Sequence, residues 1–581
     1  MTPMKYTEIL KKNARLGSQN TGEIFRIVVL SNITVVQIKE ILELSLREEG
    51  INAEVVVGNY DSIIQDSIQV ALKANAVVVF WEAANFIDNL HTNISVMQSS
   101  DIVDIAMGVE NEIDLVLRNL KDHSLVLLNS FSSLAFDSYE LDETSFKKLC
   151  REMNTVLKEK KSSNQIIVDI DPILAKTGIS HSIDFRQYIS SKNLYTIKFL
   201  KSYVEAIKPA FMAANGRSRK VLVLDCDNTL WSGILGEDGI DGIQMSDLTF
   251  NGKVFREVQT LLRGLRKNGI LLALCSKNNV SDVEHIFRTH PDILLKEDDI
   301  VAKKINWQDK PKNIKDLAVE LNLGLDSFVF LDDSEFELGL VQQALPQVKC
   351  IQVPTNLSEY PNLIRSLYRE FFCLSKSSED QQRSQMYQQE IQRKKLLKQF
   401  NSLDDYLASL DLEITIYWDC KIQISRAAQL TQKTNQFNLT TKRYTELDIE
   451  KMLASPKYIL AAFSVKDCYG EYGVTGLVIL EKKNDIPSKM FIDTFLMSCR
   501  VIGRNIEFAF FDKVVQELQY RGVTELHTEY LATSKNEQVR KFYDILGFEV
   551  VQEKEDYRNY VIQISNYRPR SIEYIRVKSH E

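Results

Sequence analysis

The sequence predicts a multidomain α/β protein, and three observations support this class. Short apolar runs alternate with helical patterns over most of the chain, which is typical of parallel, doubly wound sheets. The chain has 581 residues, which at about 150 residues per domain corresponds to about three or four hydrophobic cores. Hydrophobic residues make up 44% and charged residues 26%, so a disordered, collagen-like or coiled-coil chain is excluded.

Charge and cysteine usage narrow the class of protein further. The formal net charge is −8, which excludes a nucleic-acid-binding surface spread over the whole chain. The eight cysteines contain no CxxC pair, so neither a zinc ribbon nor a disulfide framework is indicated. No apolar stretch is long enough for a signal peptide or a membrane span, and we therefore expect a cytoplasmic location.

Residues 1–216 are predicted to form the first domain. A buried strand at residues 25–30 (FRIVVL) is followed by a helical pattern over residues 35–48. Further strands are predicted at residues 53–57, 76–80, 124–128 and 165–169. A helical pattern over residues 194–207 then leads into the small-residue segment AANGRSRK, which places the domain boundary near Gly216.

Two more domains and a linker are predicted downstream. The second domain covers residues 217–375, with strands at residues 221–224, 271–274, 328–331 and 348–353. Residues 376–402 are polar and rich in glutamine, which favours a solvent-exposed linker helix. The third domain covers residues 403–581 and mixes helices with strands at residues 458–463, 476–480 and 491–496.

The strand at residues 221–224 ends in two aspartates, in the string VLVLDCDNTLWSGILGEDG. Asp225 and Asp227 both follow this buried strand, and phosphoryl transfer explains the pairing. One carboxylate attacks phosphorus, while the other protonates the leaving group and then activates water. Both must therefore lie at the carboxyl edge of one sheet.

Three further groups of polar residues follow along the chain. Ser276 comes after the strand ILLALC, where its hydroxyl can contact a phosphate oxygen. Lys310 is placed to offset developing negative charge, with Lys312 as the alternative. Asp332 and Asp333 end the strand FVFLDD, and we expect a Mg²⁺ site formed by four carboxylates. The predicted metal ligands are Asp225, Asp227, Asp332 and Asp333.

This set of motifs resembles the haloacid-dehalogenase-like phosphohydrolases, in the cap-less subfamily IIIC. About 48 residues separate Asp227 from Ser276, and fewer separate Ser276 from Lys310. Neither gap accommodates a full cap domain. We therefore expect a cleft that is open to a large or protein-borne substrate.

Longer strings resemble the FkbH-like family over nearly the whole chain. They are LDCDNTLWSGILGEDG, CSKNN, LNLGLDSFVFLDD, KTNQFNLTTKRYT, YGEYGVTG and FLMSCRVIGRNIE. The resemblance implies an enzyme that takes 1,3-bisphosphoglycerate, removes phosphate, and loads a glyceryl unit through an enzyme thioester onto an acyl carrier protein. Such proteins belong to polyketide or surface-polysaccharide biosynthesis, so the acyl unit here can differ.

A thioester requires a cysteine, and two candidates remain open. Cys226 lies between the paired aspartates, but alternate residues of a strand face opposite ways, so we expect its side chain to point away from the cleft. Cys499 follows a strand and is flanked by Arg500 and Arg504, whose charges would depress the pKa of a thiol. Cys499 is the preferred acyl acceptor.

The third domain resembles the GNAT acyltransferase fold. The segment RVIGRN lies where that fold cradles a pyrophosphate at a helix N-terminus, and Tyr543 lies where a general acid often stands. Asn505 replaces the usual small residue of this turn, which favours the 4′-phosphopantetheine arm of a carrier protein over free CoA. The cofactor-binding residues implied by the resemblance are Arg500, Gly503, Arg504, Asn536 and Tyr543.

The first domain resembles the SGNH-hydrolase fold in a degenerate form. Ser31 follows the first strand at the position of the nucleophile, but the expected GDS is LSN and no DxxH is present. A partner-docking or supporting role is therefore preferred to an esterase. The basic stretch QRKKLLK, residues 392–398, is a candidate contact for an acidic carrier protein.

Three functions compete on these grounds. The first is an acyl-phosphate-using transferase that loads a carrier protein, which explains both the second and the third domain. The second is a plain Mg²⁺-dependent phosphatase that acts on a small metabolite or a phosphoprotein. The third is a scaffold with idle catalytic residues, and the intact set of aspartates, serine and lysine argues against it.

Overall fold

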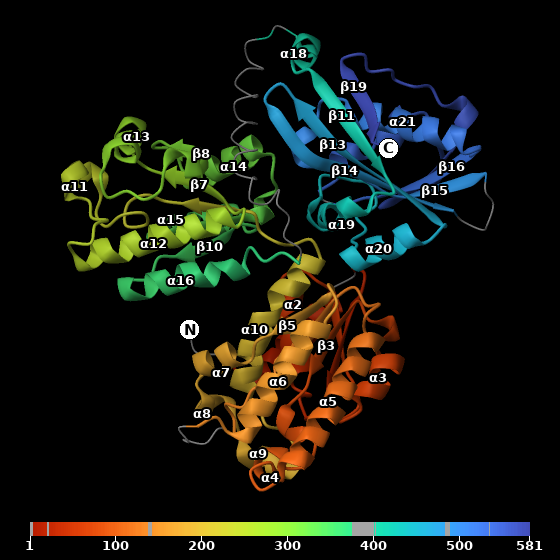
Figure 1. Cartoon of the computed structure of the whole chain (residues 1–581). Coiled ribbons are helices and arrows are strands. Elements are labelled where there is room, and N and C mark those ends of the chain that lie inside the picture. The colour runs from red at the N-terminus through yellow and green to blue at the C-terminus, as the bar shows by residue number, and fades with distance from the viewer. Residues whose placement is uncertain are drawn as a thin grey trace. The chain divides into compact units, whose positions relative to one another are not determined.

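The computed structural model describes residues 4–19, 22–136, 142–374, 400, 402–482, 488–533 and 535–580 (Figure 1). The chain divides into two compact units. The first consists of Met1–Asn215 with Tyr444–Asp448, and the second of Gly216–Arg443 with Ile449–Glu581. Within the second unit we distinguish a middle block, residues 216–374, and a C-terminal block, residues 402–443 and 449–580. The predicted linker helix lies almost entirely outside the described residues.

The first unit contains a sheet of five parallel strands in the order β2-β1-β3-β4-β5. The strands are β1 (Phe25–Ser31), β2 (Ala53–Val57), β3 (Ala76–Phe80), β4 (Val126–Asn129) and β5 (Gln165–Val168). All five predicted strands are confirmed, with β4 shifted by about two residues because Ser124 and Leu125 lie before it. The sheet is doubly wound, as the alternation of strands and helices predicts.

Helices cover both faces of this sheet. On one face α5 and α6 pack together over alternate strand residues such as Val28, Val77 and Val126. On the other, α2 packs against α1 and α10. The helices are α1 (Tyr6–Gln19), α2 (Ile38–Arg47), α3 (Ile63–Gln69), α4 (Leu90–Asn93), α5 (Ser99–Asn119), α6 (Ser145–Lys160), α7 (Asp171–Thr177), α8 (Ile179–Ser182), α9 (Phe185–Ser191) and α10 (Ile197–Ala214).

The middle block contains a second sheet of five parallel strands, in the order β10-β9-β6-β7-β8. The strands are β6 (Val221–Leu224), β7 (Leu271–Ser276), β8 (Ile300–Ile305), β9 (Phe328–Asp332) and β10 (Lys349–Gln352). The four predicted strands are confirmed. The fifth, β8, was not predicted because Lys303 and Lys304 interrupt its apolar pattern; at this sheet edge both lysines reach glutamates, Glu284 and Glu320.

No second sheet is inserted among residues 216–374. The segment between β6 and β7 forms α11 and α12. The segment between β7 and Lys310 forms α13 and β8. The absence of a full cap domain is therefore confirmed for this block. Its helices are α11 (Leu235–Gly242), α12 (Phe250–Lys267), α13 (Val280–Thr289), α14 (Lys310–Leu321), α15 (Glu335–Ala344) and α16 (Tyr360–Ser366).

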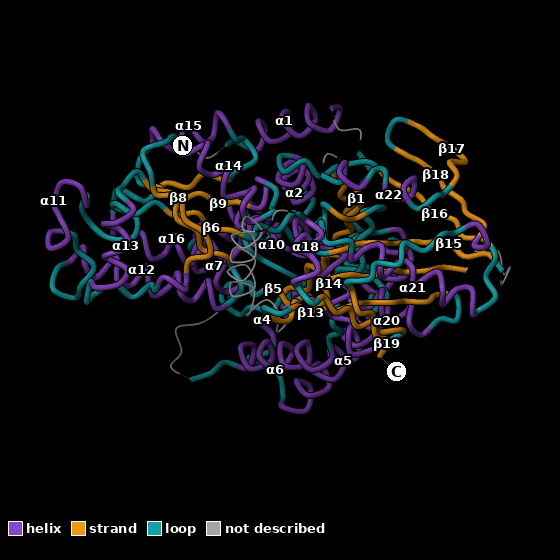
Figure 2. Tube along the Cα trace, turned by 90° about the horizontal axis from the view of Figure 1, so that it is seen from above, coloured by secondary structure: helices purple, strands orange, loops and turns teal. Residues whose placement is uncertain are grey.

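The C-terminal block is built on a third, mostly antiparallel sheet in the order β17-β18-β16-β15-β14-β13-β11-β19. Its strands are β11 (Leu412–Trp418), β12 (Phe437–Asn438), β13 (Tyr458–Asp467), β14 (Gly470–Lys482), β15 (Lys489–Met497), β16 (Glu525–Leu531), β17 (Glu549–Lys554), β18 (Tyr557–Gln563) and β19 (Ile575–His580). The three predicted strands lie within β13, β14 and β15. The hairpin of β17 and β18 can be followed in Figure 2.

One pair of strands in this sheet separates along its length. β15 and β16 run parallel, and their pairing extends from Lys489 to Ile492 on β15. Beyond that point the end of β15 pairs with β12, with Met497 opposite Phe437. β12 therefore takes the place of β16 beside the end of β15, and the chain leaves the sheet after Met497.

Aromatic side chains form much of the core of the C-terminal block. Phe495 of β15 stacks on Phe510 and Phe542, at ring-centroid distances of 5.8 and 5.2 Å. The helices are α18 (Leu403–Ser409), α19 (Ile424–Lys433), α20 (Glu446–Ala454), α21 (Ile506–Tyr520) and α22 (Phe542–Ile545). Among the described helices of the whole chain, none combines the length and the apolar character needed to cross a bilayer.

Candidate functional site

The predicted phosphoryl-transfer residues converge at the carboxyl edge of the middle sheet. Asp225 follows β6, Ser276 ends β7 and Asp332 ends β9, and these three strands are neighbours in the order β9-β6-β7. All three side chains are buried, with Asp332 fully inaccessible. The parallel arrangement thus brings together residues that are more than 100 positions apart in the sequence.

Lys310 completes this cluster from the first turn of α14. Its Nζ lies 3.1 Å from Oδ1 of Asp225 and 2.6 Å from Oδ2 of Asp332, and the side chain is buried. Asp309 caps the helix by accepting from the backbone N–H of Lys312, whose own side chain is exposed. Lys310, rather than the alternative Lys312, therefore lies between the two carboxylates.

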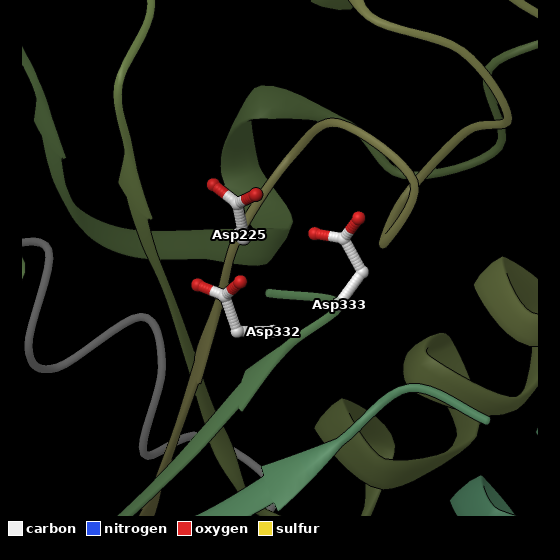
Figure 3. Close-up of side chains that lie close together, drawn as sticks. All are labelled: Asp225, Asp332 and Asp333. Atoms are coloured by element: carbon white, nitrogen blue, oxygen red, sulfur yellow. The ribbon is translucent and has the colours of Figure 1, made fainter. Parts of the chain in front are cut away.

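Three carboxylates form a group that fits a metal ion. One oxygen each of Asp225, Asp332 and Asp333 lie within 4.8 Å of one another, as Figure 3 shows for the side chains. Three carboxylates beside one ammonium leave an excess of negative charge in a buried place, which is costly without a further cation. Oxygen donors of this kind suit a hard divalent cation such as Mg²⁺.

The pKa shifts of the clustered side chains agree with an excess of negative charge at this place. The pKa of Asp225 is raised to about 7: burial raises it most, Lys310 lowers it, and the neighbouring Asp332 raises it. Burial and the charge of Asp332 also raise the pKa of Asp333. Burial alone would lower the pKa of Lys310, but the two carboxylates beside it raise that pKa above its ordinary value.

The Asp227 side chain lies outside the three-carboxylate group. Its Oδ1 accepts from Nε1 of Trp231 and from the backbone N–H of Leu235, both at 3.0 Å. Its Oδ2 accepts from Nδ2 of Asn278 at 2.9 Å. Three of the four expected metal ligands are thus brought together, while three donors hold the Asp227 carboxylate separately.

Asn278 is a site residue that the sequence reasoning did not single out. Its Nδ2 also lies 3.1 Å from Oγ of Ser276, so the amide links this hydroxyl to Asp227. The signal was present in the string CSKNN, which contains Asn278. Its choice over Asn279 needed the backbone path after β7, because Asn278 is buried and Asn279 is exposed.

Cys226 is part of the apolar core of the middle block. Its side chain is fully buried among residues such as Leu224 and Trp231. Burial raises the pKa of its thiol well above the ordinary value. A thiol in this environment is a poor nucleophile.

Cys499 lines a cavity of about 280 Å³ in the second unit. It lies two residues after the end of β15, in a short helical turn (Cys499–Val501). Arg500 lines the same cavity, and its Nε donates to Oγ of Ser498 at 3.3 Å. Arg504 instead lies in the interior, 3.6 Å from Oδ2 of Asp467 and over the ring of Tyr472.

The turn before α21 contains two residues with a left-handed backbone. Gly503 has φ +83° and Asn505 has φ +61°, both in the left-handed region. The Nδ2 of Asn505 donates to the hydroxyl of Tyr574 at 2.7 Å. The first turn of α21 also contains Glu507, whose pKa burial raises to about 7.

Two residues expected to bind a cofactor instead make contacts within the protein. Nδ2 of Asn536 donates to the carbonyls of Asn438 and Leu531, both at 2.9 Å, and its Oδ1 accepts from the N–H of Thr533. Tyr543 is 1% exposed, and burial raises the pKa of its hydroxyl. Their participation in cofactor binding stays a prediction.

Ser31, at the end of β1 in the first unit, is also engaged internally. Its hydroxyl donates to the carbonyl of Phe80 at 2.7 Å and accepts from the N–H of Ile33 at 3.2 Å. The side chain is 4% exposed. The hydroxyl therefore has both a donor and an acceptor contact within the first unit.

Neither the comparison with protein-family models nor that with curated proteins found a match. Among solved structures, the chain is similar to the N-terminal part of the protein BF1531 from Bacteroides fragilis, which contains a phosphatase domain and was crystallised with Mg. The identity is 22% and the TM-score 0.55, over 64% of this chain and 100% of that chain. This match shows that the chain contains the fold of a phosphatase domain.

Weaker similarities concern N-acetyltransferases. The ribosomal-protein-S18-alanine N-acetyltransferase from Escherichia coli matches at 16% identity and a TM-score of 0.21, over 26% of this chain and 94% of that chain. The PaiA N-acetyltransferase from Thermoplasma acidophilum, in complex with coenzyme A, matches at 13% identity and a TM-score of 0.16, over 20% of this chain and 66% of that chain. These scores are too low to show a shared fold.

Proposed function

We propose that the middle block is a Mg²⁺-dependent phosphatase of the haloacid-dehalogenase type. The observation that carries the proposal is the convergence of Asp225, Asp332 and Asp333 around Lys310 at one sheet edge. A carboxylate oxygen of Asp225 forms a bond to phosphorus while the leaving-group oxygen takes a proton from Asp227. Asp227 then removes a proton from water, which hydrolyses the aspartyl phosphate and releases Asp225.

The remaining residues of the site orient the reacting groups. Lys310 holds the carboxylates of Asp225 and Asp332 in place and offsets negative charge, and Ser276 offers its hydroxyl to a phosphate oxygen. A Mg²⁺ ion held by the three clustered carboxylates would neutralise charge on the transferring phosphoryl group. Asn278 keeps Asp227 in the orientation that proton transfer needs.

We further propose that the chain is an FkbH-like acyltransferase that uses an acyl phosphate such as 1,3-bisphosphoglycerate. The Cys499 sulfur forms a bond to the acyl carbon while the bond from that carbon to the phosphate oxygen breaks, and the departing phosphate takes the thiol proton. The middle-block site hydrolyses the remaining phosphate ester, which leaves a glyceryl thioester. The pantetheine thiol of an acyl carrier protein then attacks the thioester carbon and gives its proton to the Cys499 sulfur, which restores the Cys499 thiol. Two observations support this step. Cys499 lines a cavity, and the positively charged Arg500 lines the same cavity.

A plain phosphatase is the second candidate, and one set of contacts favours it. Asn536 and Arg504 are held by interior partners and Tyr543 is buried, so they do not by themselves support a pantetheine groove. In this case the C-terminal block would have a structural or docking role. The two candidates share the middle block and differ in whether Cys499 becomes acylated.

Intact-protein mass spectrometry separates the two candidates. The full chain is incubated with Mg²⁺ and 1,3-bisphosphoglycerate, together with Cys499→Ser, Cys468→Ser and Asp225→Asn variants. Cys468, an exposed cysteine of the same block, is the matched control. A glyceryl-sized mass gain that survives Cys468→Ser, is lost in Cys499→Ser and transfers to a carrier protein supports the transferase. Phosphate release without any mass gain leaves the plain phosphatase.

A further inference from the structure

Two parts of the chain together build the cavity at Cys499. The middle block contributes Lys220, before β6, and residues 322–327, between α14 and β9. The C-terminal block contributes the end of α19 and residues 433–436, together with residues 498–500 and Lys535. Within the second unit, the edge of the middle sheet opposite its carboxylate cluster therefore forms one wall of the cavity, because β6 and β9 begin there.

Hydrogen bonds and an ion pair connect this wall of the cavity, from the middle block, to the C-terminal block. The Nδ2 of Asn322 donates to the carbonyl of Cys499 itself at 2.7 Å. The Nζ of Lys220 donates to the carbonyl of Lys433 at 2.9 Å, and Lys535 forms an ion pair with Asp326. Asn322 ends α14 with φ +51°, so both its backbone and its amide have a defined position beside the cysteine.

The lining is strongly basic. It contains five basic side chains and one acidic side chain, Asp326. The basic residues are Lys220, Arg426, Lys433, Arg500 and Lys535. A concave site with an excess of one charge sign concentrates ligands of the opposite sign. Its volume is at the lower end of the range of small-molecule sites, which spans about 300–1,000 Å³.

We infer that the two blocks together form a binding site for a small organic anion, a phosphate ester or a carboxylate, next to the Cys499 thiol. The inference rests on the proposed function and deepens it, because it assigns a class of substrate to the cysteine. A short, negatively charged acyl group fits this cavity, whereas a long uncharged acyl chain does not. Neither block forms the site alone, since Asn322 and Lys220 come from one block and Cys499 and Arg500 from the other.

Protection of Cys499 against alkylation tests the anion site directly. The full chain is treated with iodoacetamide in the absence of Mg²⁺, with inorganic phosphate or with malonate, at constant ionic strength. Labelling of Cys499 and of Cys468 is followed by peptide mass spectrometry. We expect one or both anions to slow the labelling of Cys499 at least fivefold and saturably, while Cys468 reacts at its original rate. Phosphate alone as protectant indicates a phosphate ester, and malonate alone a carboxylate; equal rates for Cys499 with and without both anions would overturn the inference.

Two variants test the origin of the protection. Arg500→Gln removes one lining charge and should weaken the protection by at least tenfold in the apparent affinity. Arg521→Gln removes an exposed arginine of the same block, which pairs with Glu517, and should leave the protection unchanged. Equal loss in both variants would show a general charge effect and contradict the anion site.

A third variant tests the shared wall. Asn322→Gly keeps the left-handed backbone at the end of α14, since glycine tolerates positive φ, but removes the amide that holds Cys499. We expect Cys499 to react several-fold faster with iodoacetamide and to lose anion protection, with phosphatase activity retained. Unchanged labelling would refute the contribution of the middle block. If an anion protects Cys499 but Cys499 is not acylated by 1,3-bisphosphoglycerate, the transferase is rejected and the anion site stands. If Cys499 is acylated but no anion protects it, the anion site is rejected and the transferase stands.

Discussion

The parallel sheets of the first unit and of the middle block have five strands each, but their carboxyl edges differ in how the polar side chains are paired. At the edge of the first sheet, Asn32 exchanges hydrogen bonds with the backbone of Glu82, at 2.7 and 3.0 Å. Oε2 of Glu82 accepts from the hydroxyl of Tyr195 at 2.7 Å. Ser31 is bound to a backbone carbonyl. The polar groups at this edge hold the chain together.

At the edge of the middle sheet, three carboxylates share one ammonium group. Lys310 contacts Asp225 and Asp332, while Asp333 completes the group. This arrangement is costly inside a protein unless a cation or a phosphoryl group from outside completes it. The comparison teaches that a parallel sheet determines where a site can lie, and that the pairing of its polar groups decides whether a site exists there.

The largest expected effect is the loss of activity in Asp225→Asn. The amide has the size of the carboxylate but cannot act as the nucleophile, so phosphate release from p-nitrophenyl phosphate should fall at least about 10³-fold. Ser31→Ala makes a comparable small change after β1 in the first unit and should leave phosphate release unchanged. If Ser31→Ala also abolished activity, the contrast between the two edges would be wrong.

Replacing Lys310 should affect stability as well as activity. In Lys310→Met the carboxylates of Asp225 and Asp332 lose their buried partner, and the free energy of unfolding in denaturant should fall by about 3–5 kcal/mol without Mg²⁺. Phosphate release should fall by about 10²-fold or more. Lys312→Met, two residues later on the exposed side of α14, is the matched control and should change stability by less than about 0.5 kcal/mol. Equal effects of the two substitutions would contradict the pairing.

Much of the phosphatase site could be predicted from the sequence because its chemistry follows strand ends. Asp225, Ser276 and Asp332 each come directly after, or at the end of, an apolar run, and parallel strands bring such positions to one edge. The edge strand β8 was missed because its two lysines break the apolar pattern. The separate position of Asp227 could not be predicted, since its donors come from two segments: Trp231 and Leu235 follow β6, and Asn278 follows β7.

The residues of the C-terminal block were harder to predict for a physical reason. Asn536 and Tyr543 belong to short turns after β16. In such turns a shift of one residue decides whether a side chain faces a cleft or the core. Here Tyr543 packs on Phe548 and Tyr560, at ring-centroid distances of 5.1 and 5.4 Å. The cavity wall from residues 322–327 was equally out of reach, because it depends on packing between segments about 175 residues apart.

The buried Glu82, at the carboxyl edge of the first unit's sheet, makes the stability of that unit depend on pH. Burial raises its pKa from 4.5 to about 7, although the hydrogen bonds from Tyr195 and from the backbone of Ala84 and Ala83 oppose the shift. Between these values the folded chain keeps a proton that the unfolded chain has released. The contribution of Glu82 to stability is therefore complete below pH 4.5 and is lost as the pH rises through about 7.

Glu82→Gln should remove this dependence. Wild type should lose up to about 3 kcal/mol relative to the variant between pH 4.5 and pH 8, as measured by the free energy of unfolding of the first unit. Glu152→Gln, at an exposed glutamate on α6, should follow the wild-type profile. Parallel profiles for wild type and Glu82→Gln would show that the polar network at this edge does not hold a buried acid.

Mg²⁺ gives the smallest expected effect and the most direct contrast between the two edges. If the clustered carboxylates hold the ion, Mg²⁺ at ten times its Kd should stabilise the second unit by about 1.4 kcal/mol. The first unit should unfold at an unchanged temperature in the same calorimetric scan, since its edge offers Glu82 already bound by Tyr195 and backbone donors. Asp333→Asn keeps the shape of the side chain, removes one charged ligand, and should reduce the stabilisation at the same Mg²⁺ concentration. A shift of both unfolding transitions would indicate general ion binding. A shift that persists in Asp333→Asn would place the ion elsewhere. A shift that is confined to the second unit and depends on Asp333 would show that the unbalanced charge at its edge is what distinguishes two sheets of the same kind.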